Sequence, residues 1–164
     1  MANLTGLFGI LMDLLKSASV AYVHYLSFMI CFGALVFERI SIKINPNRKE
    51  AITMVVADIV YGIAGIALLI TGIYRVIKFG QGTEFYTGNP LFWTKIIIFA
   101  LVGSLSLYPT VTYILWAIPL SKGMLPEVTS NLVTRLKIII NVELIGFSLI
   151  PFFATLMARG IGLN

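Results

Sequence analysis

The sequence contains little charge and few of the residues that usually build catalytic or metal sites. Of its 164 residues only 12% are charged, whereas soluble domains carry about 25%. Hydrophobic residues make up 59% of the chain, and the mean hydropathy is +0.96. This composition excludes an ordinary soluble domain and indicates a single domain embedded in a lipid bilayer.

Cysteine and histidine each occur once, as Cys31 and His24. A lone cysteine excludes an internal disulfide, and its place within an apolar run indicates a small buried side chain rather than a redox centre. A lone histidine excludes a haem held by two histidines of one chain. The sequence contains no zinc motif, phosphate-binding loop, dinucleotide fingerprint or nucleophile triad, and its basic residues form no nucleic-acid-binding patch.

Four long apolar runs dominate the chain, and the segments between them are rich in charge, glycine and proline. A helix needs roughly 20 residues to cross a bilayer core about 30 Å thick. The runs cover residues 20–37, 52–74, 92–118 and 132–157. We therefore predict an all-α fold, an integral membrane four-helix bundle formed by one domain, residues 1–164.

Apolar residues recur at helical spacing ahead of the first run as well. They are Leu4, Leu7, Phe8, Leu11, Leu14 and Leu15. This segment either lies in the membrane interface as an N-terminal amphipathic helix or lengthens the first span. It lacks the basic region and the small-residue cleavage site that mark a signal peptide.

Basic residues are slightly more numerous in the first and third loops than at the termini and in the second loop. Seven of the twelve fall on the side of the first and third loops, and five fall on the side of the termini. Because positive charge accumulates on the cytoplasmic side, we expect both termini on the non-cytoplasmic side of a bacterial plasma membrane or thylakoid-type membrane.

Small and polar residues mark the faces on which membrane helices pack together. In the first span Ser17, His24, Cys31 and Glu38 recur every seven residues, which places His24 on an inward face. The second span has a comparable stripe, formed by Asp58, Gly62, Gly65, Gly72 and Arg75. Its glycines indicate either tight helix packing or room for a flat ligand.

Four residues lie toward the end of the bundle that carries the termini, and we expect them to converge there. They are His24, Arg75, Trp93 and Lys95. His24 either forms a hydrogen bond to Ser27 or to another helix, or is an axial ligand of haem iron. Arg75 and Lys95 either reach to the interface or bind the propionates of a porphyrin.

Three further ionisable residues fall inside the apolar runs or at their edge, where charge is costly and a function is suspected. They are Arg39, Asp58 and Glu143. Asp58 either pairs with Arg39 or a neighbouring backbone as a structural contact, or handles protons. Glu143 is two residues from Asn141, so we expect these side chains to point to nearly opposite faces, with Glu143 protonated and hydrogen-bonded.

Two segments carry a resemblance to known families. HYLSFMICFGALVFERI, which starts at His24, and GTEFYTGNPLFWTK, residues 82–95, resemble a family of small bacterial four-span membrane proteins without an assigned activity. More remotely, the arrangement is similar to HemJ-type protoporphyrinogen oxidase, a four-helix membrane protein that binds haem b. His24, Arg39, and Trp93 with Lys95 hold positions comparable to the histidine, the arginine and the tryptophan–lysine pair of that family.

The HemJ resemblance implies that His24 ligates haem b and that Lys95 is tied to haem binding and catalysis. We therefore expect a haem b-binding oxidoreductase whose cofactor site includes His24, Arg75, Trp93 and Lys95. The alternative is a non-catalytic accessory or assembly subunit of a larger respiratory or photosynthetic membrane complex, or a homo-oligomer. A third hypothesis is a small carrier or channel that uses Asp58 and Glu143.

Overall fold

The computed structural model describes the backbone of residues 2–162 and the side chains of residues 6–162. Its helices are α1 (Ala2–Ser41), α2 (Arg48–Ile77), the short α3 (Thr83–Thr87), α4 (Pro90–Ser121) and α5 (Ser130–Ala158). No strand occurs between residues 2 and 162, so the predicted all-α fold is confirmed. Each of the four apolar runs lies within one long helix.

Side chains that cap the first turn set the starts of these helices. Oδ1 of Asn47 accepts a hydrogen bond from the backbone N–H of Glu50, and the Glu50 carboxylate accepts one from the N–H of Asn47, both at 2.9 Å. This capping box satisfies N–H groups that no helical carbonyl reaches. The side-chain oxygens of Asn89 and Thr129 cap the starts of α4 and α5.

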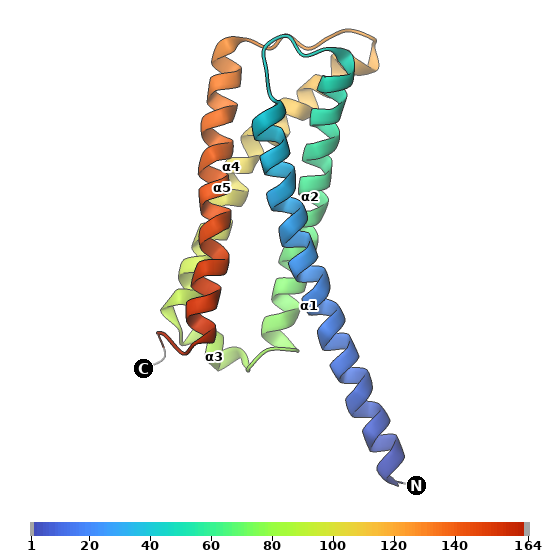
Figure 1. Ribbon diagram of the computed structural model, residues 1–164, viewed down its shortest axis with the longest axis vertical. Helices are drawn as coiled ribbons and strands as arrows, with labels where there is room; N and C mark the ends of the chain where they lie inside the picture. Colours follow the sequence, from blue (N-terminus) through green and yellow to red (C-terminus); the bar gives the residue numbers. More distant parts are fainter. Residues whose placement is uncertain (1, 163–164) are drawn as a thin grey trace.

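The long helices form two antiparallel hairpins, α1 with α2 and α4 with α5 (Figure 1). The hairpins meet where α2 packs on α4 and α1 packs on α5. Among the described residues, no Cα atoms of the diagonal pairs α1–α4 and α2–α5 lie within 8 Å of each other, although the rings of Tyr61 on α2 and Phe147 on α5 meet edge to face. Both ends of the chain lie near the end of the bundle that carries α3, which we call the termini end. The segments 42–47 and 122–129 lie at the other, the loop end.

Helix α1 is continuous from Ala2 and runs well past the rest of the bundle (Figure 1). Its 40 residues span roughly 60 Å, about twice the thickness of a bilayer core. Of the two alternatives for the N-terminal segment, the structure therefore has the lengthened first span. The apolar side chains of this extension are at least half exposed at Leu7, Phe8, Leu11, Leu14 and Leu15, and the Leu4 side chain lies outside the described residues.

Large apolar side chains cover the outside of the bundle. Ile63 and Ile66 on α2, Leu107 on α4 and Ile145 on α5 are each more than 60% exposed. Such a surface, continued along whole helices, suits lipid acyl chains and not water. All four long helices have the length and composition to cross a bilayer.

The interior faces of α1 and α2 differ in how well the sequence predicts them. On α1 the predicted face is correct, because Ser27, Cys31 and Glu38 are buried. On α2 the glycine stripe is not the buried face, since a Cβ added at Gly62 or Gly65 would meet nothing within 4 Å. The residues that α2 buries are Ala51, Met54, Asp58, Tyr61, Ala64 and Leu68. Larger side chains therefore fill the core, and these two glycines border open space.

Helix α5 approaches α4 closely at Gly146. A Cβ added at Gly146 would lie 2.5 Å from Cγ2 of Val102, whereas one added at Gly103 would meet nothing within 4 Å. We expect Gly146→Ala to lower the free energy of unfolding by about 1–3 kcal/mol, the usual cost of overpacking. The control Gly103→Ala should leave it unchanged or raise it by up to about 1 kcal/mol, because alanine favours a helix.

Unfolding of the detergent-solubilised variants, followed by circular dichroism, measures both effects. Equal stability of Gly146→Ala and Gly103→Ala would contradict the close α4–α5 contact.

Candidate functional site

His24 lies on the face of α1 that packs against α2, and its ring forms a hydrogen bond between the two helices. Nδ1 of His24 lies 3.0 Å from Oγ1 of Thr71. The hydroxyl proton of Thr71 is already used, since Oγ1 donates to the carbonyl of Ala67 at 2.6 Å. We infer from this that Nδ1 carries the proton and donates it to Oγ1. Of the two predicted hydrogen bonds, the one to another helix is present.

The second ring nitrogen of His24, Nε2, forms no hydrogen bond with a side chain among residues 6–162. Metal-binding histidines share this arrangement, in which a neighbour holds one ring N–H and fixes the tautomer while the other nitrogen is the ligand. Gly72 leaves room for the ring, because a Cβ there would lie 3.3 Å from Cε1 of His24. Helix α2 thus orients the imidazole and leaves Nε2 as an available donor atom.

Arg75 of α2 and Lys95 of α4 lie close enough to His24 for their charges to act on its ring. Both are half-buried, and neither forms an ion pair with a carboxylate among residues 6–162. Nη2 of Arg75 donates to Oη of Tyr25 at 3.1 Å, and Nζ of Lys95 lies 5.0 Å from the centre of the Phe92 ring. The termini end therefore gathers an imidazole and two cations that contact aromatic side chains instead of acids.

Trp93 does not join this cluster. Its Nε1 donates to the carbonyl of Thr87 at 3.0 Å, and its side chain is 49% exposed. It ties α4 to the C-terminal residue of α3, and an exposed indole is typical of a membrane interface. Two positions along a helix are separated by about 200° of rotation, which is why Trp93 and Lys95 point to different sides of α4.

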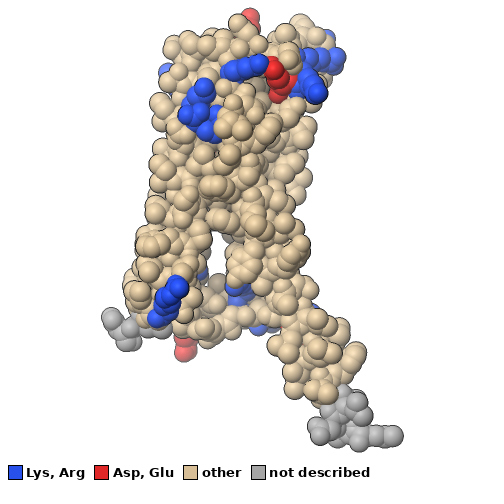
Figure 2. All heavy atoms as spheres, viewed as in Figure 1, with Lys and Arg blue, Asp and Glu red and all other residues tan. Residues whose placement is uncertain are grey.

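The cluster of His24, Arg75 and Lys95 joins residues of both hairpins. His24 belongs to α1 and Lys95 to α4, a diagonal pair with no Cα atoms within 8 Å of each other among the described residues. Figure 2 shows an opening between the hairpins in the half of the molecule nearer the termini, with lysine or arginine atoms beside it. Apolar packing therefore does not close this part of the bundle.

The glycines of α2 border a separate groove between α2 and α4. It has a volume of about 200 Å³ and is lined by Gly62, Gly65 and Gly103 together with larger side chains, but not by His24. Ligand pockets usually begin at roughly 300 Å³. The glycine stripe and His24 therefore do not form one site for a flat ligand, and Gly72 alone of the stripe's glycines lies against the His24 ring.

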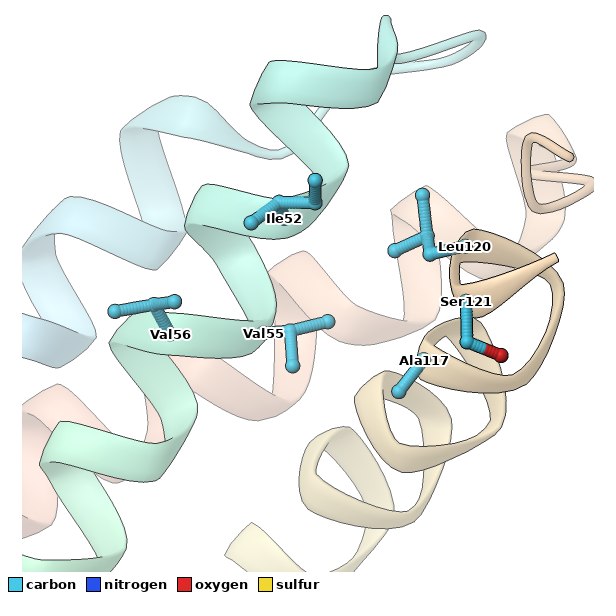
Figure 3. Close-up of a pocket in the computed structure, with 6 residues that line it drawn as sticks. All are labelled: Ile52, Val55, Val56, Ala117, Leu120 and Ser121. Atoms are coloured by element: carbon cyan, nitrogen blue, oxygen red, sulfur yellow. The ribbon is translucent and has the colours of Figure 1, made fainter. Parts of the chain in front are cut away.

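A second groove, of about 260 Å³, lies between α2 and α4 at the loop end (Figure 3). Its lining consists of Ile52, Val55, Val56, Ala117, Leu120 and Ser121. Val55 and Ala117 point toward each other across it. No ionisable side chain lines this groove, so it has the character of a lipid-facing surface rather than a catalytic site.

A second polar cluster lies inside the bundle, and each long helix contributes one member. The members are Glu38 of α1, Asp58 of α2, Tyr113 of α4 and Glu143 of α5, all at most 6% exposed. Each of them lies close enough to at least one other member for their charges to act on each other. Asp58 accepts a hydrogen bond from Thr110 at 2.8 Å. We call these four residues the buried carboxyl layer.

Most oxygens of the buried carboxyl layer lack a partner. Oε1 of Glu38, Oη of Tyr113 and both carboxyl oxygens of Glu143 form no hydrogen bond with residues 6–162. Within the same residues, no lysine or arginine forms an ion pair with any of the layer's carboxyl groups. Unpartnered buried polar groups are costly, so the layer requires an explanation beyond simple packing.

Arg39 turns away from the buried carboxyl layer. Its Nε donates to Oδ1 of Asn141 at 2.6 Å, on the exposed side of α5. Of the alternatives for Asp58, the pair with Arg39 is therefore not formed, because Asp58 is buried and accepts from Thr110. The opposite orientations expected for Asn141 and Glu143 are confirmed, since Asn141 is exposed and Glu143 is completely buried. The hydrogen bond expected for Glu143 is absent among residues 6–162.

Sequence reasoning did not single out Thr71 or Tyr113. Tyr113 follows the buried Pro109 by four residues and precedes Trp116 by three, and this spacing is a signal that could have placed it inward. Thr71 has no comparable signal, because a helix accommodates a threonine hydroxyl by bonding it to its own backbone. The role of Thr71 depends on which residue of α1 packs against it, and the sequence of α2 alone does not show this.

The four long apolar helices and their lipid-facing surface define an integral membrane protein. The family model described as predicted membrane protein (DUF2214) matches residues 16–162, and the chain belongs to that family. This agrees with the resemblance to a family of small four-span membrane proteins. No curated protein and no solved structure matches the chain. The comparisons thus add no support to the HemJ resemblance, which rests on short segments only.

The tautomer of His24 can be read directly, because the chain has a single histidine. In protein labelled with nitrogen-15 histidine and kept at alkaline pH, we expect the Nδ1–H form to dominate. Thr71→Val removes the acceptor and should shift the population toward the Nε2–H form that free imidazole favours. Thr112→Val removes a hydroxyl that bonds only its own helix and should change nothing. A dominant Nε2–H form in the unmodified protein would contradict the assignment.

Proposed function

We propose that this integral membrane protein is a haem b-binding redox protein in which Nε2 of His24 is an axial ligand of the iron. The observation that carries this proposal is the hydrogen bond between Nδ1 of His24 and Oγ1 of Thr71. It fixes the ring in the tautomer in which Nε2 keeps its lone pair, and such outer partners also raise the basicity of a ligating imidazole.

Arg75 and Lys95 support the same proposal. A porphyrin of the haem b type has two propionate groups, and charge-assisted hydrogen bonds from these side chains suit them. Both cations lie near His24 and lack a carboxylate among residues 6–162. Half-buried cations at the edge of a bilayer are stabilised by an anionic partner, which a bound propionate provides.

The residues present fit a haem group in their chemistry. A bound haem would supply one-electron chemistry at its iron. The protein would supply the iron ligand, the charged groups near the porphyrin and the limits on solvent access. Thr71 orients the ligand, and Arg75 and Lys95 bind carboxylates. As the HemJ resemblance implies, Lys95 is also the candidate catalytic residue, which would bind a carboxylate of the substrate. Because the chain has a single histidine, His24 is the one imidazole that would hold the iron of a bound haem.

A second candidate function has one observation in its favour. The extension of α1 exposes apolar side chains, among them Leu7, Phe8 and Leu14, beyond the rest of the bundle. Such a helix surface suits contact with a larger respiratory or photosynthetic complex, in which this chain would be an accessory subunit. Mild detergent extraction followed by native electrophoresis tests this alternative, and migration as a free bundle would count against it.

Absorption spectra of purified protein supplied with haem test the main proposal. We expect a Soret band that shifts on reduction with dithionite and is lost in His24→Ala, because the variant lacks the axial nitrogen. Thr71→Val should keep the Soret band but change the midpoint potential, since it alters only the orientation and basicity of the imidazole. Unchanged helix content by circular dichroism confirms that the variants fold. Absence of a Soret band, or an unaltered band in His24→Ala, would overturn the proposal.

If Arg75 and Lys95 bind the propionates, removing either positive charge should weaken haem binding. Arg75→Gln and Lys95→Gln should each weaken haem binding by about tenfold, which corresponds to about 1.4 kcal/mol. Lys78→Gln is the matched control, because Lys78 is exposed and lies one turn beyond Arg75 at the termini end. Equal haem affinity in all three variants would show that propionates are not bound at this cluster.

A further inference from the structure

We propose that the buried carboxyl layer is a proton-binding site within the membrane part of the bundle. Its ligand is the proton, and its members come from all four long helices: Glu38, Asp58, Tyr113 and Glu143. The proposal rests on their burial, on their unpartnered oxygens and on the absence of a balancing cation among the described residues. It is independent of the proposed haem site.

Charge balance favours protons as the occupant. Three carboxylates facing one another in an apolar interior would repel strongly, and each would lose its hydration without compensation. No lysine or arginine offsets them, because Arg39, the cation next to Glu38 in the chain, contacts Asn141 instead. Bound protons remove the negative charge. They also give the carboxyl groups an O–H that can donate a hydrogen bond to one of the unpartnered oxygens.

Every long helix contributes a titratable group to this region. Helix α1 contributes Glu38, α2 contributes Asp58 and Tyr61, α4 contributes Tyr113, and α5 contributes Glu143. All five groups are acids or phenols, and none is a base. Thr110 donates a hydrogen bond to Asp58, and Ser106 forms one with Tyr61.

A metal ion is a poorer occupant than the proton. Among the described residues no group of three or more histidine, cysteine, aspartate or glutamate side chains is placed to hold a metal ion. The proton needs no such convergence, because one carboxyl oxygen is enough to bind it.

The layer is separated from His24 and from both ends of the bundle. Glu38 follows His24 by fourteen positions on α1, which is roughly 21 Å along the helix. On α1, Leu35 of one apolar cluster and Ile42 of the other lie on either side of Glu38. On α2, Met54 and Tyr61 flank Asp58 in the same way. The layer is therefore an internal proton store, enclosed by apolar clusters above and below.

Infrared spectroscopy of the solubilised protein tests this directly, in a detergent without ester groups so that no lipid carbonyl band interferes. At neutral pH we expect the C=O stretching band of protonated carboxyl groups, shifted when water is replaced by heavy water. Glu38→Gln and Glu143→Gln imitate protonated carboxyls in shape, so they should fold, and each should reduce the band by roughly a third to a half. Glu127→Gln is the matched control, because Glu127 is exposed in the loop 122–129.

The infrared band of protonated carboxyl groups distinguishes a proton site from its absence. A band that Glu143→Gln and Glu38→Gln reduce and Glu127→Gln leaves unchanged would support the proton site. Absence of the band at neutral pH in the unmodified protein would overturn it, and so would a band that neither buried variant reduces. The unmodified protein alone can give the overturning result, so the test does not depend on whether a variant folds. Because no haem is needed, failure here leaves the proposed haem site unaffected.

Discussion

The absence of water from the bilayer core is the constraint on which this structure depends. Without water, every backbone polar group in the core must find its partner within the protein, which leaves long helices as the solution for this chain. Lipid is as apolar as leucine, so helices gain little from hiding leucines from it, and their association depends on close packing and polar contacts. The contact at Gly146 and the hydrogen bonds of His24 and Arg39 to neighbouring helices are contacts of this kind.

The fold could be predicted from the sequence because the membrane leaves so few options. Apolar runs of the right length, separated by loops rich in charge and glycine, predict the four helices. Small and polar residues that recur every seven positions predict the inward face of α1, namely Ser17, His24, Cys31 and Glu38. The glycine stripe of α2 does not identify the buried face of that helix. A small residue occurs both where helices pack closely and where space is left empty, and the sequence does not distinguish these two cases.

The site was only partly predictable, for a related physical reason. His24, Arg75 and Lys95 lie together because depth along a span can be counted from the sequence. Trp93 is directed elsewhere because rotation about a helix changes by about 100° per residue, so a two-residue offset reverses direction. The partners Thr71 and Thr110 belong to neighbouring helices, and which residues of two helices meet depends on their relative height and rotation. No single-helix pattern encodes that register.

The two polar clusters divide the interior by depth and by charge. The cluster at the termini end is basic and borders an opening, whereas the buried carboxyl layer is acidic and enclosed. A cation-rich end favours anionic ligands, and an enclosed acidic centre disfavours them. The same bundle thus presents two different environments within one membrane thickness.

The division of the bundle into two hairpins has a consequence for how the protein is made. Most of the helix–helix packing lies within each hairpin, α1 with α2 and α4 with α5, and less lies between them. The halves can therefore enter the membrane one after the other as independent units, and the bundle is completed only when they associate sideways. The connection through α3 then acts as a tether that keeps the second half near the first, which makes the final association a local event within one chain.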